Sequence, residues 1–446
     1  MKFTQKNWAH LSTASTLALI FIWVLPNTIA LRHLLLGLGS ISGIFLIKDV
    51  SKYFYNFKFC FIPLYAILGL FFWVAIHYYF FSLNPSLELS EIKGLWIRTL
   101  AGSIMAVGLG ISLCRFPSLR KYFYISVFFV PIINISAYLY DSYLLGNFVN
   151  PSAFVFFLFA KIETAYFGGI AAAVSVASIA FCILNPKTPK KYIQIFLYTL
   201  GLLLVLISDT ISNTKNGILI AMLMSSLLVA IVFFHALFFA KSHNAKILGI
   251  AVIIFVIIGS GLIWNAHKKL AYGGWDTLFQ DTQIAMDIDN NKQWSYIEGT
   301  HGVPLNPQGL PVAQNVYVRV AWATVGMRLI AQYPLGYGSI NQSFNGLQTY
   351  ANVSHEHTGQ AHSGWVDFGM AFGVPGLLLI FCSILCTAGF AIVRPNHLSL
   401  IGMMIGLMLI PFCLTAEMSY KQYFESMIFF LTLSATFVAL PEEGWT

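Results

Sequence analysis

Residues 216–240 read NGILIAMLMSSLLVAIVFFHALFFA, a run of 25 residues without Asp, Glu, Lys or Arg. About 20 apolar residues in a helix are enough to cross the roughly 30 Å hydrocarbon core of a bilayer. The run is continuously apolar and does not alternate between apolar and polar residues, which argues against a strand of an outer-membrane β-barrel. This stretch therefore predicts a transmembrane helix.

Similar runs recur along most of the chain. The predicted spans number twelve and fall near 11–29, 32–48, 59–82, 96–114, 122–141, 166–184, 192–210, 216–240, 246–264, 364–393, 397–414 and 423–440. Of the 446 residues, 58% are hydrophobic and only 9% are charged, whereas soluble proteins carry about 25% charged residues. The expected fold class is therefore an all-α polytopic membrane protein with about 12 transmembrane helices, and a set of soluble domains is excluded.

The distribution of basic residues predicts the orientation of the helices. With a cytoplasmic amino terminus, the inside segments contain 14 of the 25 Lys and Arg: Lys2, Lys6, Lys48, Lys52, Lys58, Arg115, Arg120, Lys121, Lys187, Lys190, Lys191, Lys241, Lys246 and Arg394. Because short cytoplasmic loops are enriched in Lys and Arg, both termini are predicted to be cytoplasmic. The net charge of +8 then indicates membrane topology and not a nucleic-acid partner.

One connection is much longer than the others. Residues 265–363 form a polar segment on the predicted outer side, rich in Gly, Asn, Gln and Trp. Within it, Thr277–Asp289 and Tyr317–Gln332 have helical character, and the second helix is expected to end before Pro334. Long loops of this kind are usually functional. The predicted organisation is a nine-span region (1–264), a large periplasmic loop (265–363) and a three-span region (364–446).

Cofactor motifs are missing from the sequence. The six cysteines lie within or at the ends of apolar runs and form no CxxC pair, so neither a disulfide framework nor a zinc site is indicated. No GxxxxGK[ST] motif occurs, nor a GxGxxG motif between a strand and a helix. We therefore expect no cofactor.

Ionisable residues within the spans are scarce and lie near the outer boundary. Arg98, Asp367 and Glu425 are each close to the outer end of a predicted span. A transporter would place charges or broken helices near the midplane, often in repeated halves. Polar groups at the outer boundary instead indicate chemistry at the outer leaflet.

Two basic residues at this boundary are candidates for binding an anion. Lys215 lies in the sequence SNTKNG at the start of span 216–240, where helix amides and the helix dipole favour negative charge. Arg319 lies one turn before Trp322, so that one helix face presents both a guanidinium that can bind two phosphate oxygens and an aromatic ring. The structural alternatives are a capped helix with a snorkelling lysine and an amphipathic helix whose arginine touches lipid headgroups.

Histidines gather just before span 364–393. His355, Glu356, His357 and His362 lie within eight residues, but their spacing is not HExxH and no thiolate accompanies them, so a metal site is not expected. A single histidine at a water–membrane boundary suits general-base catalysis, because the pKa of a free imidazole is about 6.5. A purely structural role is the alternative.

The residues from His362 onwards resemble a known pattern. His362-Ser363, nine residues, Gly373, two residues and Gly376 match H-[NSQ]-x9-G-x-x-[GTY]. This pattern marks the O-antigen ligase (WaaL-like) family of bacterial membrane glycosyltransferases, which shares a superfamily with O-antigen polymerases and protein O-oligosaccharyltransferases. The chain is also similar to this family from Arg319 to Trp322 and in the sequence YPLGYG at 333–338.

The resemblance implies a GT-C-like protein of the bacterial inner membrane that acts in lipopolysaccharide biosynthesis. It implies transfer of O-antigen polysaccharide from undecaprenyl pyrophosphate to a hydroxyl of lipid A–core oligosaccharide at the periplasmic face. His362 would be the base, and Arg319 and Lys215 would hold the pyrophosphate; the supporting residues are Trp322, His355, His357 and Ser363. The family usually has arginine at the position of Lys215, and lysine keeps the charge but loses the bidentate fork.

The expected partners are the undecaprenyl-pyrophosphate-linked donor, the lipid A–core acceptor and membrane lipid, without nucleic acid. The missing carboxylate pairs favour a metal-independent, inverting displacement. Trp275, Trp294 and Trp322 could stack on sugars or could anchor the loop at the interface. The remaining alternatives are an O-antigen polymerase, a protein O-oligosaccharyltransferase and, from a different class, a transporter of lipid-linked glycans.

Overall fold

The fold was analysed in a computed structural model, which describes residues 4–23, 25, 27–55, 59–150, 161–185, 188–238, 243–270, 276–296, 301–353, 359–417 and 421–440. Across these ranges the secondary structure is helical, and the only β-type pairing is an isolated bridge between Leu305 and Pro311. The predicted all-α class is therefore confirmed.

The helices follow one another without a repeated unit. The first half contains α1 (Gln5–Ile22), α2 (Ile29–Tyr55), η1 (Phe59–Phe61), α3 (Ile62–Phe80), α4 (Pro85–Glu91), η2 (Ile92–Trp96), α5 (Ile97–Arg115), η3 (Pro117–Leu119), α6 (Arg120–Leu145), α7 (Lys161–Leu184) and α8 (Lys191–Ile211). The second half contains α9 (Lys215–Phe238), α10 (His243–Leu270), α11 (Leu278–Met286), η5 (Lys292–Ser295), α12 (Gln314–Gln332), α13 (Ser343–Tyr350), α14 (Gly364–Val393), α15 (His397–Thr415) and α16 (Lys421–Ala439).

Among the described residues, 11 helical segments are long and apolar enough to cross a membrane. The chain is therefore a multi-pass membrane protein. The first predicted span, 11–29, is not among them, because α1 ends at Ile22 and α2 begins at Ile29. After α1 the chain turns, since the Leu25 amide and the Thr28 hydroxyl both donate to the carbonyl oxygen of Ile22, at 3.0 and 3.1 Å. Apolar composition alone did not reveal that turn.

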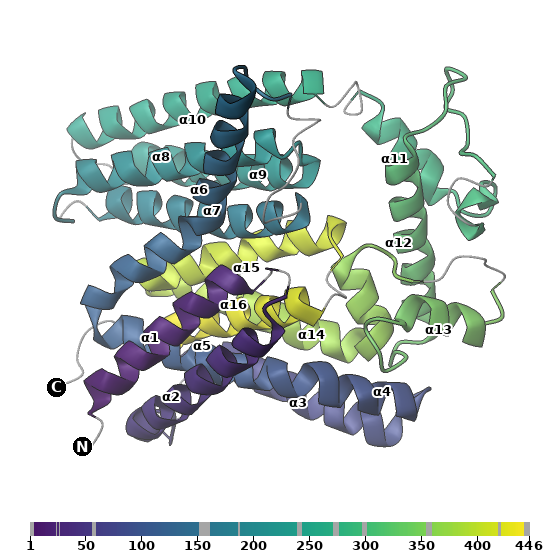
Figure 1. Ribbon diagram of the computed structural model, residues 1–446, viewed down its shortest axis with the longest axis horizontal. Helices are drawn as coiled ribbons and strands as arrows, with labels where there is room; N and C mark the ends of the chain where they lie inside the picture. Colours follow the sequence, from purple (N-terminus) through teal and green to yellow (C-terminus); the bar gives the residue numbers. More distant parts are fainter. Residues whose placement is uncertain are drawn as a thin grey trace.

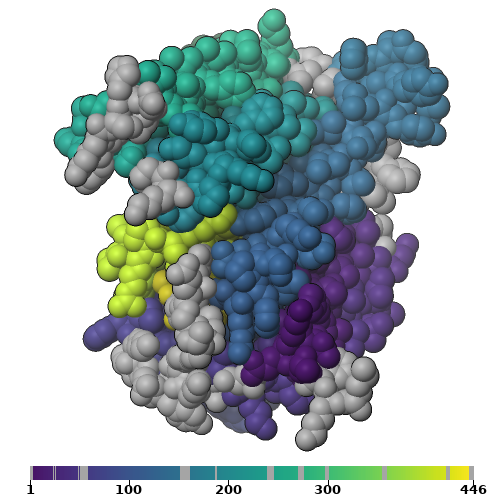
Figure 2. Space-filling view, turned by 90° about the vertical axis from the view of Figure 1, so that its left-hand side faces the viewer, coloured from purple at the N-terminus to yellow at the C-terminus, as the bar shows by residue number. Residues whose placement is uncertain are grey.

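The membrane helices form two groups in Figure 1. Helices α7–α10 lie in the upper part of the view, and α1–α3, α5 and α14–α16 lie below them. The loop helices α11, α12 and α13 gather at the right-hand end. Figure 2 shows the opposite end, where the blue α6 lies between the teal helices and the purple α1 and α2.

Helix α7 connects the two groups because its side chains are small. It contains Gly168, Gly169 and the run Ala171–Ala173, and nearly all its residues from Thr164 onwards are buried. It packs against α8 and α9 in one group and against α15 in the other. A Cβ atom on Gly169 would lie 2.9 Å from the Met408 sulfur. Small residues therefore permit the close helix packing that membrane bundles need.

Helix α14 contains a break that receives a segment of the long loop before it. Gly373 has φ 68° and ψ −171°, a conformation essentially restricted to glycine. Pro375 has no N–H group, so the carbonyl of Ala371 lacks its partner within the helix. The amide of Gly338 donates to this carbonyl at 2.7 Å. The two glycines therefore join the loop to α14.

Two further backbone bonds complete this junction. The amide of Val374 donates to the Pro334 carbonyl at 2.8 Å, and the amide of Tyr337 donates to the Met370 carbonyl at 2.8 Å. The sequence 334–338 is thus the segment that supplies hydrogen-bond partners to the broken part of α14. This arrangement explains why a membrane helix can be interrupted at this point, because each freed backbone group finds a partner.

We expect Gly373→Ala to destabilise the protein, because a Cβ at this position would collide with the Pro334 carbonyl and because φ is positive. The expected loss is about 1–3 kcal/mol, measured as a lower thermal unfolding temperature in detergent. Gly389→Ala is the matched control on the same helix, since nothing lies within 4 Å of a Cβ there. Equal unfolding temperatures for the two variants would contradict this account of the junction.

Buried carboxylates hold the next part of the loop. Glu91 accepts hydrogen bonds from the Ser339 hydroxyl and from the Ile340 amide, the latter at 2.9 Å. Glu88 pairs with His77 at 2.9 Å, with both side chains fully buried. The predicted span 96–114 began too late to include these carboxylates, because α4, η2 and α5 form one continuous segment, Pro85–Arg115. Glu91 is thus paired with the loop and Glu88 with His77 of α3, so both buried carboxylates of these turns have partners.

Candidate functional site

The backbone conformation and two side-chain contacts constrain His362. Its backbone has φ 54°, the left-handed region that residues other than glycine seldom adopt. Its imidazole stacks on Trp322, with ring centroids 5.4 Å apart and planes at 20°. Its Nδ1 lies 2.8 Å from Oε2 of Glu417, whose side chain is only 6% exposed, whereas the His362 side chain is 31% exposed. Strained and clamped residues of this kind concentrate at functional sites.

The pairing with Glu417 has a chemical consequence. When neutral His362 carries its proton on Nδ1 and donates it to the carboxylate, Nε2 keeps its lone pair and can accept a proton. The carboxylate then stabilises the imidazolium that forms, as in other histidine–carboxylate pairs. The geometry therefore suits His362 as a general base and Glu417 as its positioning residue.

The Trp322 side chain is a support for His362 and is not an exposed platform. It is 2% exposed, and its Nε1 donates to the Trp294 carbonyl at 2.9 Å. Trp294 is also buried, at 9% exposure. Both tryptophans pack in the hydrophobic core of the long loop. Their rings are therefore not exposed for stacking on a sugar or for anchoring the loop at the membrane interface. Trp275 lies outside the described residues.

The entrance of α14 is fixed to the end of α15. The amide of Gly364 donates to the Ala416 carbonyl at 2.9 Å, which places Glu417 beside His362. Asp367 is buried and accepts a hydrogen bond from the Ala361 amide at 2.8 Å, so it orders the segment before His362. Ser363 is the N-cap residue of α14 and is buried, without a side-chain capping bond.

Lys215 is the first residue of α9 and is exposed. Next to it, the Thr415 hydroxyl donates to the Asn216 side-chain oxygen at 2.7 Å, which joins the start of α9 to the end of α15. Lys215 and Lys161 both lie within electrostatic range of His267 on α10. The amino termini of α7 and α9 therefore lie near the last turn of α10, and Lys161 and Lys215 form a basic cluster beside His267.

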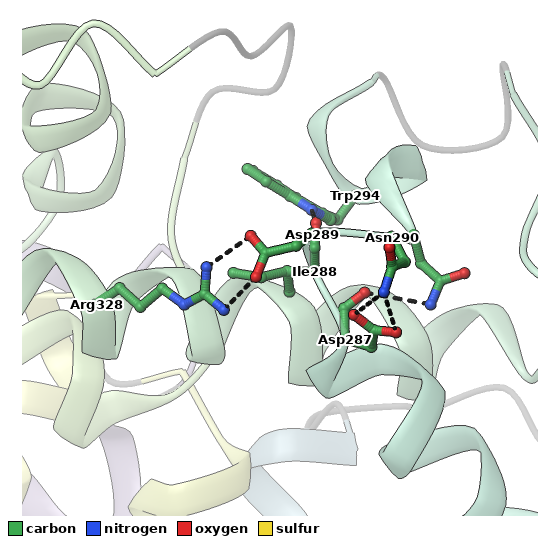
Figure 3. A network of polar contacts seen from close by, with 7 residues as sticks. Asp287, Ile288, Asp289, Asn290, Trp294 and Arg328 are labelled. Atoms are coloured by element: carbon green, nitrogen blue, oxygen red, sulfur yellow. Dashed lines mark hydrogen bonds and ion pairs between the residues drawn. The ribbon is translucent and has the colours of Figure 1, made fainter.

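The two arginines of α12 differ in their surroundings. Arg319 is exposed, and within the described part of the chain no hydrogen bond or ion pair of its side chain is found. Arg328 forms two parallel bonds of 2.8 Å to the Asp289 carboxylate, with Asn290 and Asp287 beside them, as Figure 3 shows. The Arg328 guanidinium lowers the pKa of the Asp289 carboxyl. Arg328 is therefore engaged in the loop, whereas Arg319 is available to a ligand.

The remaining predicted residues were not placed. His355 and His357 lie outside the described residues, so their supporting role stays a prediction. Within the described ranges, no group of three or more His, Cys, Asp or Glu side chains is arranged to hold a metal ion. The basic cluster and the His362–Glu417 pair are the charged groups around which a site can be built.

Sequence reasoning missed two members of this arrangement. Glu417 lies 55 positions after His362, in the connection between α15 and α16, and no spacing rule links the two residues. Lys161 was not singled out in the sequence, yet it begins α7 and, like Lys215, lies within electrostatic range of His267. The one sequence signal for Glu417 was its position, since it is an acidic residue at the outer boundary of the predicted span 397–414.

Part of the chain matches a known protein family. Residues 200–381 match the model of the O-antigen ligase (Wzy_C) family. A comparison with curated proteins finds no match. The matched range includes Lys215, Arg319, His362 and the broken part of α14, and it ends before Glu417. Over residues 200–381 the chain is therefore similar to the O-antigen ligase family, as the resemblance in its sequence predicted.

Proposed function

We propose that this protein transfers O-antigen polysaccharide from undecaprenyl pyrophosphate to a hydroxyl of lipid A–core oligosaccharide, at the periplasmic face of the bacterial inner membrane. The observation that carries the proposal is the His362–Glu417 pair beside the start of α9. The match of residues 200–381 to the O-antigen ligase family supports a glycosyltransferase of the O-antigen ligase and polymerase type. The choice of ligase within this type is part of the proposal.

The proposed reaction is a single displacement. Nε2 of His362 takes the proton of the acceptor hydroxyl as its oxygen attacks the anomeric carbon from the face opposite the pyrophosphate. The bond between this carbon and the pyrophosphate oxygen breaks, and undecaprenyl pyrophosphate leaves with the bonding electrons. The stereochemistry at the anomeric carbon is inverted. The histidine then carries the proton, and the Glu417 carboxylate balances its charge.

The leaving group defines the role of the basic residues. Pyrophosphate carries negative charge throughout the reaction, so cations and helix amino termini at this point stabilise it. Lys215 and Lys161 each begin a helix, α9 and α7, and combine a side-chain charge with the positive end of a dipole. Arg319 adds a planar fork that binds phosphate oxygens in pairs. We assign these three residues to the pyrophosphate.

Reconstitution tests this function directly. The purified protein is supplied with an undecaprenyl-pyrophosphate-linked glycan and, in separate reactions, with lipid A–core or with a single undecaprenyl-linked repeat unit. We expect the glycan on lipid A–core, with an inverted anomeric configuration by NMR and an unchanged rate in EDTA. Longer undecaprenyl-linked chains instead would identify a polymerase, and a loss of rate in EDTA would contradict metal independence.

Arg319→Ala should lower the rate of transfer about 10–100-fold, because a charge-assisted bidentate contact contributes about 1.5–3 kcal/mol. Arg328→Ala is the matched control on the same helix, since Arg328 is engaged in an exposed ion pair with Asp289 and its replacement should leave the rate of transfer nearly unchanged. Arg319→Lys should recover only part of the rate, because it restores the charge without the fork. Equal losses for Arg319→Ala and Arg328→Ala would remove Arg319 from the site.

A further inference from the structure

A second set of charged residues lies between α1, α2, α5 and α16, apart from the His362 site. A cavity of about 230 Å³ is lined there by Trp23, Ile29, Arg32, His33, Arg98 and Glu425 among others. Glu425 is in the second turn of α16, a helix that begins four residues after Glu417. The cavity is therefore at the same end of the bundle as His362, and the proposed reaction uses none of its residues.

The lining of this cavity carries an excess of positive charge. Arg98 pairs with Glu425, with Nε and Oε1 2.7 Å apart. Arg32 donates to the Trp23 carbonyl at 2.8 Å, a neutral partner, and lies within electrostatic range of both Arg98 and Glu425. Two guanidinium groups therefore share one cavity with one carboxylate. Like charges in a poorly solvated region repel strongly, so a bound anion would relieve the repulsion.

One donor group in the cavity lacks a partner. Nε of Arg32 is buried and makes no hydrogen bond within the described part of the chain. A buried donor without a partner costs free energy, which an acceptor in the cavity would recover. Phosphate oxygens fit this position, because a guanidinium presents several N–H groups in one plane and binds two oxygens at once.

The size and surroundings of the cavity identify the source of the anion. Sites for larger organic ligands usually have about 300–1,000 Å³, so a cavity of about 230 Å³ suits a headgroup and not a glycan chain. On α2, the apolar side chains Ile29, Leu31, Leu34 and Leu38 are exposed, and Ile29 also lines the cavity. Exposed apolar side chains on a membrane helix contact lipid tails. The anion can therefore enter as part of a lipid.

We propose that this cavity binds the phosphate headgroup of an anionic lipid from the outer leaflet, with the lipid tails along α2. Arg32 and Arg98 bind the phosphate oxygens, and Glu425 keeps Arg98 in position. The binding does not require the transfer reaction, so it can be tested apart from the proposed function.

Native mass spectrometry of the purified full-length protein measures this binding. The protein is supplied with phosphatidic acid, a phosphate monoester, or with phosphatidylcholine of the same acyl chains. We expect wild-type protein to retain phosphatidic acid at least about tenfold more strongly. Arg32→Gln should reduce this preference about tenfold, whereas Arg32→Lys should keep part of it. Equal retention of the two lipids by wild-type protein overturns the proposal, whatever the variants do.

Two controls separate the site from general surface charge. Lys93→Gln removes an exposed cation of η2, outside the cavity lining, and should leave the preference unchanged. Inorganic phosphate at millimolar concentration should not displace the lipid, because it lacks the tails. A loss of preference in Lys93→Gln, or displacement by inorganic phosphate, would overturn the assignment to a lipid headgroup.

Discussion

Replacing His362 with alanine is expected to stop the attachment of glycan to its acceptor. General-base catalysis contributes about 10²–10⁴ in rate, and the variant loses the imidazole that stacks on Trp322 and pairs with Glu417. The measurement is the lipopolysaccharide ladder on a gel in a strain that lacks the native gene, with expression matched to the wild type. The pool of lipid-linked glycan is extracted from the same cells.

The two readouts separate the candidate functions. Loss of the ladder with accumulation of long undecaprenyl-linked chains supports a ligase, because polymerisation and export continue. Single repeat units attached to the core would instead identify a polymerase. His301→Ala is the matched control, since this exposed histidine of the same loop also stacks on an aromatic ring, that of Tyr296. An unchanged ladder in His362→Ala would show that His362 is structural.

Replacing Glu417 with glutamine should have the second largest effect. The amide can still bond to Nδ1 of His362, but it cannot balance the imidazolium, and it can favour the wrong tautomer. In a comparable histidine–carboxylate pair, the carboxylate-to-amide exchange lowers the rate about 10⁴-fold. We expect a loss of about 10²–10⁴ in kcat, with KM for the donor unchanged, because Glu417 contacts the proposed base His362.

The conservative variant and a matched carboxylate test this role. Glu417→Asp keeps the charge on a shorter side chain and should recover part of kcat, which a merely structural role would not produce. Glu163→Gln is the control, since Glu163 is at the same end of the bundle and accepts a hydrogen bond from the Tyr423 hydroxyl. If Glu417→Gln raises KM and lowers the unfolding temperature while kcat stays the same, Glu417 has a structural role only.

Much of the fold could be predicted because its signals are local. Each of these signals lies within one segment: the long apolar runs of α9 and α14 and the helical pattern of α12. The structure has a helix at each of these positions. The same reasoning missed α13, Ser343–Tyr350, which is short and weakly apolar. It also joined the end of α1 to the turn before α2, because hydropathy counts residues and does not detect a change of chain direction.

The sequence predicted individual residues of the candidate site, but it did not predict which side chains contact one another. The pattern around His362 and Gly376 singled out the histidine, and charge at the outer boundary singled out Lys215 and Arg319. The sequence alone could not show that Trp322 would be buried against His362. That result depends on Trp294, which is 28 positions earlier and accepts the indole hydrogen bond.

The sequence by itself determined the membrane class, most of the spans and the identity of the chemical groups, because hydropathy and side-chain chemistry belong to each residue. The tertiary structure decided which groups meet. Glu417 reaches His362 because the start of α14 is bonded to the end of α15, and Gly338 reaches Ala371 because Pro375 leaves a carbonyl unpaired. Such contacts depend on the packing of segments far apart in the chain, which no local pattern records.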